Sequence, residues 1–457
     1  MKKHSQTRSS FSGKIGFVLS AAGASVGLGN IWRFPYLAAK YGGGIFLLIY
    51  ILLALTFGYT MIVAETAIGR MTKKSPVGAF HKFGSSKWLS FGGWINAIIP
   101  LLIVPYYSVI GGWVIKYLLG YIQGNSQLLA QDGYFTDFIS NGISTELCFL
   151  AFALFTIIII YAGVRNGIER VSKFMMPVLV ILSIIITIYS VTRPGALAGV
   201  KYFLVPNMKN FSWMTVVTAM GQMFYSLSIA MGILITFGSY MKEDVSIENA
   251  TENVEIFDTA IAIIAGLMII PAVFAFSGGD PDALQAGPSL MFITIPKMFA
   301  SMGFSTGIGI LFFLLVLFAA ITSSIALTES AVSTFEDELG WGRKKATVFV
   351  GILIVILGSL SSLGYGPLAG IKLIGMQFLD FFDFLTNSVM MPIAAIATCL
   401  LISRVAGIAA IEEEVLKGEN RFRRKKIFCF MIQYLCPIFA AIILISSIAN
   451  AFGWISM

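Results

Sequence analysis

The stretch SVGLGNIWRFPYL, residues 25–37, lies within the first long apolar segment of the chain. It contains two glycines, an asparagine, an arginine and a proline, whereas a membrane-spanning helix is usually a continuous apolar rod of about 20 residues. In hydrocarbon, each unpaired backbone group costs several kcal/mol, so a break in a span persists only where other groups satisfy it. The stretch therefore raises the question of which groups satisfy the backbone at this break.

The rest of the sequence has the composition of a helical membrane protein. Hydrophobic residues make up 57% of the 457 residues and charged residues only 12%, against roughly 25% charged in a soluble domain. We predict an all-α polytopic protein with eleven transmembrane helices, because eleven apolar segments approach or exceed the length of a span. These segments are 14–38, 43–69, 88–120, 146–163, 170–192, 211–241, 255–276, 304–335, 346–364, 373–403 and 427–453.

The positions of the basic residues set the expected orientation. Most of the 31 lysines and arginines fall in loops that are cytoplasmic if the N-terminus is inside. An odd number of spans then places the C-terminus outside the cytoplasm. The net charge of +8 therefore needs no nucleic-acid partner to explain it. The charge runs at 412–414 and 421–426 are interpreted as a solvated inner loop.

A second interrupted segment lies at residues 221–240, GQMFYSLSIAMGILITFGSY. Ser226, Ser228 and Gly232 fall near its middle, and it is the sixth segment, five after the first break. Interrupted helices at matching positions in two halves are the sequence sign of a transporter built from inverted repeats. One break alone is explained equally well by a glycine hinge or by close helix packing, but the pair favours a binding site.

The paired breaks divide the chain into four parts. A cytoplasmic N-terminal tail, 1–13, precedes the first five-helix repeat, 14–193. The second, inverted five-helix repeat, 194–404, contains an interrupted outer loop at 277–303 that is long enough to act as a lid or to serve as a connector. Residues 405–457 form an inner loop and an eleventh helix.

An unwound helix offers two kinds of binding group. Gly27 and Gly29 allow the chain to leave helical geometry. Carbonyl oxygens on one side of the break suit a hard cation such as Na⁺, and amides on the other side suit a carboxylate. The segment FAAITSSIAL, 318–327, adds the hydroxyls of Thr322 and Ser323, which indicate either a second cation site or hydrogen bonds between helices. Glu65 is expected to satisfy the unwound backbone of segment six.

Three stretches closely resemble the neurotransmitter:sodium symporter family, in its bacterial amino-acid-transporting branch. They are AGASVGLGNIWRFPYLAAKYGGGIF (22–46), GQMFYSLSIAMG (221–232) and AAITSSIAL (319–327). The resemblance spans segments one to ten and implies a LeuT-like five-plus-five inverted repeat with broken helices 1 and 6. It also implies a multi-pass protein of the bacterial inner membrane that couples Na⁺ to amino-acid uptake by alternating access.

Two sodium sites follow from the resemblance. The ligands implied for the first ion are the substrate carboxylate and four residues of the chain, Ser25, Asn30, Ser226 and Asp258. Those implied for the second ion are Gly23, Val26, Ala319, Thr322 and Ser323. Asp258 is expected either to ligate the first sodium or to replace the chloride that other members bind, so transport should not require chloride. No organic cofactor is implied.

The resemblance also implies a substrate site between the two breaks. The amides of Leu28 and Gly29, with the Tyr107 hydroxyl, would hold a carboxylate, and glycine at position 27 favours an amino acid over a monoamine. Because no charge faces the substrate side chain, we expect a hydrophobic amino acid such as leucine, methionine, tryptophan, tyrosine or phenylalanine. The full set of implied substrate-binding residues is Ala24, Leu28, Gly29, Ile103, Tyr107, Tyr225, Ser228, Met231, Ser323 and Leu327.

Two gates are implied by matching charged residues. Arg33 and Asp383 would form the outer gate, with Asp380 as a competing partner. Arg8, Tyr240 and Asp337 would form the inner gate. The alternatives are a snorkelling arginine at position 33 and an ordinary solvated charge run at 336–338.

Three other classes of function compete with a symporter. A channel or passive facilitator is disfavoured, because no pore-like ring or filter repeat is present. A receptor that binds amino acids without transporting them predicts saturable binding without accumulation. An enzyme is not expected, because the sequence contains no nucleophile and base constellation. The oligomeric state is not predicted.

Overall fold

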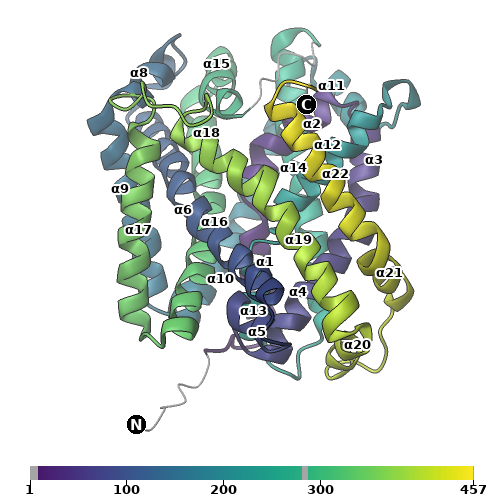
Figure 1. The fold of residues 1–457 in the computed structure, drawn as a ribbon. Helices are drawn as coiled ribbons and strands as arrows, with labels where there is room; N and C mark the ends of the chain where they lie inside the picture. Colours follow the sequence, from purple (N-terminus) through teal and green to yellow (C-terminus); the bar gives the residue numbers. More distant parts are fainter. Residues whose placement is uncertain (1–8, 280–286, 456–457) are drawn as a thin grey trace.

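The computed structural model describes residues 9–279 and 287–455, and these residues form a bundle of helices joined by loops. Most of the helices run between the two ends of the bundle, and the described chain starts at the lower end and finishes at the upper end (Figure 1). The expected all-α architecture is confirmed.

The helices up to residue 204 include the first broken segment. They are α1 (Lys14–Ser25), η1 (Gly29–Arg33), α2 (Phe34–Lys40), α3 (Gly44–Leu53), η2 (Ala54–Gly58), α4 (Tyr59–Thr72), α5 (Pro76–His81), α6 (Lys87–Ile122), α7 (Ser126–Leu129), α8 (Tyr134–Ser140), α9 (Gly142–Tyr161), η3 (Val164–Glu169), α10 (Arg170–Val191) and α11 (Ala196–Leu204).

The helices that follow include the second broken segment. They are η4 (Met208–Asn210), α12 (Trp213–Ser226), α13 (Ile233–Ser239), α14 (Ile247–Ser277), η6 (Leu290–Thr294), α15 (Ile295–Ser301), α16 (Ser305–Leu339), α17 (Arg343–Leu363), α18 (Phe378–Asp383), η7 (Phe384–Met390), α19 (Met391–Leu400), η8 (Leu401–Ala406), α20 (Ile408–Leu416), α21 (Lys425–Phe430), η9 (Met431–Leu435) and α22 (Cys436–Ala451).

Within the described ranges, nine helices are long and apolar enough to cross a membrane, or ten if one bent pair is counted as a span. That pair is Lys14–Ser25 and Gly29–Lys40, which meet at 53°. Neither α12, with 14 residues, nor α13, with 7, reaches the length of a span by itself. The predicted number of eleven spans therefore stays a prediction.

The first break follows from the residues that occupy it. α1 ends at Ser25, and Val26 is extended, with φ −73° and ψ 93°. The chain returns to helical geometry at Gly29, and η1 continues directly into α2, so Gly29–Lys40 forms one helix. Pro35 lies in the second turn of this helix, just after the π-helical turn, and supplies no backbone N–H to it. The break itself is therefore confined to the residues between Ser25 and Gly29.

The second break covers residues 227–232, between α12 and α13. Ser228, Ala230 and Gly232 have φ of 53°, 57° and 69°, a left-handed conformation that is unfavourable for the first two. The fully buried Glu65 of α4 accepts a hydrogen bond of 2.7 Å from the Ala230 N–H. This contact is the one expected of Glu65, and it satisfies one N–H group of the unwound backbone.

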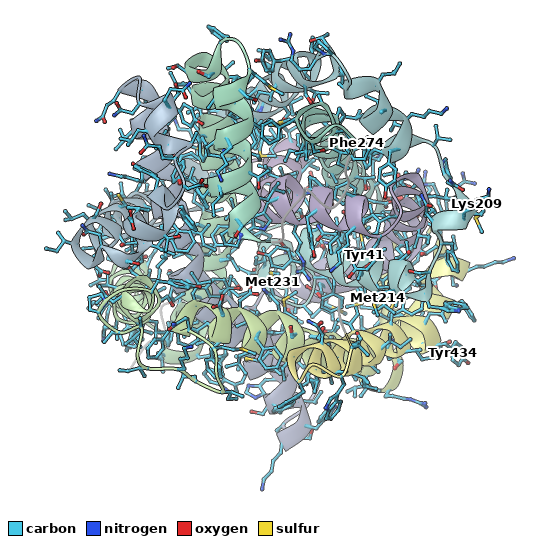
Figure 2. The ribbon with its side chains drawn as sticks, turned by 90° about the horizontal axis from the view of Figure 1, so that it is seen from above. Tyr41, Lys209, Met214, Met231, Phe274 and Tyr434 are labelled. Atoms are coloured by element: carbon cyan, nitrogen blue, oxygen red, sulfur yellow. The ribbon has the colours of Figure 1, made fainter. Side chains whose placement is uncertain are left out.

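The breaks lie at the centre of the bundle. α6 and α16, with 36 and 35 residues, pack against each other, and α1 packs against α14 and α16. Seen from above, Met231 lies near the middle, whereas Lys209 and Tyr434 lie at the edge (Figure 2). α9, α17 and α22 carry exposed apolar side chains, as expected of a surface covered by lipid.

The expected lid loop, 277–303, is described in part. Residues 280–286 lie outside the described residues. The remainder contains an apolar helix, Leu290–Ser301, that is too short to span a membrane. Tyr117 of α6 anchors this helix by donating a 2.7 Å hydrogen bond to the Phe292 carbonyl.

Candidate functional site

A small cavity of about 30 Å³ lies between the two breaks. All ten residues predicted to bind substrate line it, together with two predicted sodium ligands, Ser25 and Ser226, and Gly27. The lining is Ala24, Ser25, Gly27, Leu28, Gly29, Ile103, Tyr107, Tyr225, Ser226, Ser228, Met231, Ser323 and Leu327. Residues as far apart in the sequence as Ala24 and Leu327 thus converge on one buried space.

A cluster of buried polar groups adjoins this cavity. The Asn30 amide donates to Ser226 Oγ and to Asp258 Oδ1, both at 2.9 Å. Ser226 Oγ lies 3.1 and 3.0 Å from the two Asp258 carboxylate oxygens. Three of the four residues predicted for the first sodium therefore contact one another. Ser25 lines the adjacent cavity, and its hydroxyl donates to the Ala21 carbonyl at 3.1 Å.

Tyr50 of α3 belongs to the same cluster, and sequence reasoning did not identify it. Its hydroxyl donates to Asp258 Oδ2 at 3.2 Å, and its side chain is fully buried. A tyrosine in an apolar helix gives no signal that distinguishes it from packing, so only the three-dimensional arrangement identifies this contact. Asp258 thus has Asn30, Ser226 and Tyr50 as hydrogen-bond donors.

A second group of oxygen atoms surrounds Ser323 of α16. Its Oγ lies 3.3 Å from the Gly23 carbonyl, 3.1 Å from that of Ala24 and 3.5 Å from that of Val26. The Thr322 hydroxyl lies 3.1 Å from the Ala319 carbonyl. All five residues predicted for the second sodium lie together here. Unwound carbonyls and hydroxyls are the oxygen ligands that broken-helix transporters use for Na⁺.

The backbone of the first break is in close contact with the opposite wall. The Leu28 N–H donates to the Tyr107 hydroxyl at 3.3 Å, and the Gly27 N–H donates to Asn30 Oδ1 at 3.1 Å. A β-carbon at position 27 would lie 2.7 Å from Ser323 Oγ, and one at position 29 would lie 2.6 Å from the Tyr225 ring. A side chain at either position would overlap these neighbours, so both positions require glycine.

Gln222 is another residue of the site that was not assigned a role from the sequence. Its side-chain amide donates to the Gly29 carbonyl at 3.1 Å, and it is fully buried in α12. The contact ties one broken helix to the other. The Gly29 carbonyl also accepts from the Phe34 N–H of its own helix, so Gln222 adds a second donor to it.

A larger cavity of about 710 Å³, which we call the vestibule, lies beyond Tyr225. Arg33 and Asp383 both line it, and Tyr225 lines both the vestibule and the small cavity. Tyr225 therefore separates the two spaces. The Arg33 guanidinium lies over the Tyr225 ring, 5.2 Å from its centroid.

The two residues of the predicted outer gate, Arg33 and Asp383, line the same vestibule. No ion pair joins Arg33 to Asp383 in the part of the chain that the structure describes. Asp383 instead accepts hydrogen bonds from the Tyr106 hydroxyl at 3.2 Å and the Asn387 amide at 2.6 Å. The competing Asp380 accepts one from the Tyr365 hydroxyl at 3.1 Å.

The predicted inner gate is described only in part, because Arg8 lies outside the described residues. Asp337 accepts a 2.6 Å hydrogen bond from the Ser75 N–H. The Tyr240 hydroxyl donates to Glu329 at 2.6 Å, and Glu329 forms an ion pair with Arg343, also at 2.6 Å. No role was assigned to this buried glutamate, although an acid within the predicted segment 304–335 is a signal that could have identified it.

Comparison with known proteins decides the family. The family model of the sodium:neurotransmitter symporters matches residues 8–129 and 136–453. The chain belongs to the sodium:neurotransmitter symporter family. It is 34% identical to the uncharacterised sodium-dependent transporter YhdH of Bacillus subtilis, over 97% of each chain. It is 26% identical to the sodium- and chloride-dependent taurine transporter of the dog, over 88% of this chain and 72% of that one.

A solved structure resembles this symporter over nearly its whole length. The crystal structure of MhsT in complex with L-phenylalanine matches with a TM-score of 0.86 and 35% sequence identity. The match covers 96% of this chain and 100% of MhsT. The predicted family and the LeuT-like fold are confirmed. This symporter is a multi-pass membrane transporter that uses sodium, and it is not an enzyme.

Proposed function

We propose that this symporter couples Na⁺ to the uptake of a hydrophobic amino acid by alternating access. The observation that carries the proposal is the buried cavity between the breaks, where backbone amides, oxygen clusters and an apolar wall meet. An amino acid has a carboxylate, an ammonium and a side chain, and each of these finds a matching group there. The Leu28 and Gly29 amides, with Tyr107, hold the carboxylate, and carbonyls of the break accept from the ammonium.

The two oxygen clusters fit two sodium ions. Ser25, Asn30, Ser226 and Asp258 hold the first ion, and the substrate carboxylate completes its coordination. The carbonyls of Gly23, Val26 and Ala319, with the hydroxyls of Thr322 and Ser323, hold the second ion, as their proximity supports. Because substrate and first ion share a contact, each raises the affinity for the other by the same factor.

Asp258 supports transport that does not require chloride. Its carboxylate lies 2.9 Å from the Asn30 amide and about the same distance from Ser226, so a fixed negative charge is present beside the first ion. A mobile anion is then not needed to balance the sodium charge. Equal uptake in chloride and in gluconate is expected, and uptake that collapses in gluconate would refute this part of the proposal.

The wall of the cavity supports a hydrophobic side chain. Ile103, Met231 and Leu327 line it, and each is at least 95% buried. No charged residue lines the small cavity among the residues described. MhsT, which shares the fold, was solved with L-phenylalanine. Leucine, methionine, phenylalanine, tyrosine and tryptophan are therefore the proposed substrates.

The arrangement of the two cavities supports alternating access. Tyr225 separates the substrate cavity from the vestibule, and Arg33 lies above it. We propose that the vestibule faces the outside of a bacterial inner membrane, with a cytoplasmic N-terminus, eleven spans and the C-terminus outside. Arg33 and Asp383 close the outer side, and Arg8, Asp337 and Tyr240 close the inner side.

Equilibrium binding to the purified protein tests the proposal. Labelled L-phenylalanine and L-leucine are titrated in NaCl, in KCl and in sodium gluconate. Saturable binding that needs Na⁺ but not chloride is expected, with competition by the other hydrophobic amino acids. Binding of lysine or glutamate without competition from leucine or tryptophan would refute the proposed substrate class.

A further inference from the structure

Asp383, the acid of the proposed outer gate, is the last residue of α18, and it is exposed and lines the vestibule. Two donors from different elements bind one of its carboxylate oxygens. Oδ1 accepts a 2.6 Å hydrogen bond from the Asn387 amide of η7 and a 3.2 Å hydrogen bond from the Tyr106 hydroxyl of α6. α18 lies toward the upper end of the bundle, as does α2, which follows Arg33 (Figure 1). One oxygen of the gate acid is therefore held from two sides.

The other carboxylate oxygen, Oδ2, has neither a hydrogen-bond donor nor an ion-pair partner among the residues that the structure describes. Arg33 lines the same vestibule, with its guanidinium over the Tyr225 ring. A carboxylate accepts hydrogen bonds on both oxygens at once. Arg33 can therefore bind Oδ2 without displacing either donor from Oδ1.

Asn387 also contacts the second donor. Its side-chain nitrogen lies 3.3 Å from the Tyr106 hydroxyl, which is almost fully buried. The amide has two N–H groups, one for each of these acceptors, and Tyr106 then has its own hydrogen left for Asp383. The three side chains form a closed triangle of hydrogen bonds, and this triangle fixes the orientation of the carboxylate.

We propose that Asn387 is a positioning residue for the outer gate. Together with Tyr106 it holds Asp383 Oδ1, so that Oδ2 is oriented to receive Arg33 when the gate closes. This inference rests on the gate of Arg33 and Asp383 in the proposed function. Because the carboxylate is already ordered in the open vestibule, closing the gate does not have to order it.

Loss of Asn387 should shift the protein toward an open gate. Immobilising one flexible side chain changes an equilibrium constant by about two- to tenfold. N387A should therefore release bound phenylalanine faster by about that factor. Y106F should act in the same direction, because it removes the other donor to Oδ1.

A double-mutant cycle with Arg33 in the full-length protein tests the proposal. Dissociation of labelled L-phenylalanine in NaCl is compared for wild type, N387A, R33A and the double variant. N387A should speed dissociation when Arg33 is present and have no effect in R33A, where the gate pair cannot form. S388A is the matched control, because Ser388 follows Asn387 and lines the vestibule but makes no side-chain hydrogen bond within the described ranges.

Three results of this cycle would overturn the proposal. They are unchanged dissociation in N387A, an equal change in S388A, and an effect of N387A that persists in R33A. The last would show that Asn387 supports the local structure rather than the gate pair.

Labelling of a cysteine in the vestibule tests the same inference without a substrate. Val217 lines the vestibule, so V217C should react with a membrane-impermeant thiol reagent faster when the gate is open. The parent protein gives the background from its four cysteines, two buried and two half-buried. N387A should raise the V217C rate about two- to tenfold, and it should not raise it further in R33A.

An unchanged V217C rate in N387A would overturn the proposal. This result does not depend on which solute the protein carries. Absence of phenylalanine binding by the wild type would instead count against the proposed function alone, so the two failures are distinguishable.

Discussion

At single positions of the first break, the neighbouring side chains determine which residue type fits. Position 29 has the Tyr225 ring at 2.6 Å from where a β-carbon would be, and position 27 has Ser323 Oγ at 2.7 Å. The conspicuous glycines were visible in the sequence. Ser323 was also singled out from its own segment, whereas Tyr225 was named only through the family resemblance. Tyr50 and Gln222 were not assigned a role, because a buried tyrosine and a buried glutamine are common in membrane helices and have no spacing that marks them.

We predict that G29A weakens substrate binding by at least about tenfold while the protein still folds. A methyl group at this position would lie 2.6 Å from the Tyr225 ring and forces the ring to move from the wall of the cavity, and overpacking of this kind costs about 1 to 3 kcal/mol. Calorimetric binding of phenylalanine in NaCl measures the effect. G221A is the control, because nothing lies within 4 Å of its β-carbon. Equal losses in both variants would contradict the assignment.

Asp258 should set the affinity for sodium. Two unit charges about 4 Å apart contribute about 4 kcal/mol at an effective dielectric constant of 20, part of which is offset by desolvation. D258N should therefore raise the Na⁺ concentration needed for half-maximal binding by about tenfold or more. Y50F keeps the charge and removes only the 3.2 Å hydrogen bond, so a change of a few fold is expected. Sodium titrations that place D258N at or below Y50F would refute the role of Asp258.

Elements are joined by contacts between groups far apart in the sequence. The second break was predicted from its serines and glycine, and Glu65 was correctly expected to satisfy its backbone. The charge runs at 412–414 and 421–426 were interpreted as a solvated inner loop, and this interpretation is wrong for Glu414, which lies in α20 and is buried. Glu414 is 2% exposed and pairs with Arg70 at 2.7 Å, because α20 packs against α4. A charge run gives no information about which of its members the fold buries.

The unwound backbone of the second break should depend on Glu65. E65L leaves the Ala230 N–H without an acceptor in a buried position, and this should lower the free energy of unfolding by about 1 to 3 kcal/mol. E65Q keeps a carbonyl acceptor and should lose less. Thermal unfolding in detergent, followed by tryptophan fluorescence, compares the two. If E65Q is as destabilised as E65L, the hydrogen bond is not the reason for the buried acid.

Arg70 should stabilise the loops around it through α20. Besides Glu414, its guanidinium donates to the Val245 carbonyl at 2.5 Å, so it joins α4, α20 and the loop before α14. R70L leaves a buried carboxylate unpaired and should lower the free energy of unfolding by about 3 to 5 kcal/mol. K425Q breaks the half-exposed pair with Glu412 and should change it by less than about 1 kcal/mol. Equal effects in chemical denaturation would contradict this.

The whole molecule is a bundle in which two broken helices meet at the centre. Hydropathy predicted its class and most of its helices, and the paired breaks predicted where the site lies. By length and composition, the described helices account for at most ten spans. The predicted eleventh would consist of α12 and α13, each of which is too short to cross a membrane alone. That Arg33 and Asp383 form no ion pair with each other in the described part of the chain was not predictable either, because a protein with several conformations pairs its gate residues in only some of them.

The central claim is that a sodium gradient drives a hydrophobic amino acid across the membrane through this site. Uptake of labelled phenylalanine into proteoliposomes under an imposed inward Na⁺ gradient tests it most directly, with each of the twenty amino acids as competitor. The account predicts accumulation above the outside concentration that is abolished by dissipating the gradient and reduced by leucine, methionine, tyrosine and tryptophan. Saturable binding without accumulation, or flux that equilibrates phenylalanine regardless of Na⁺, would contradict it.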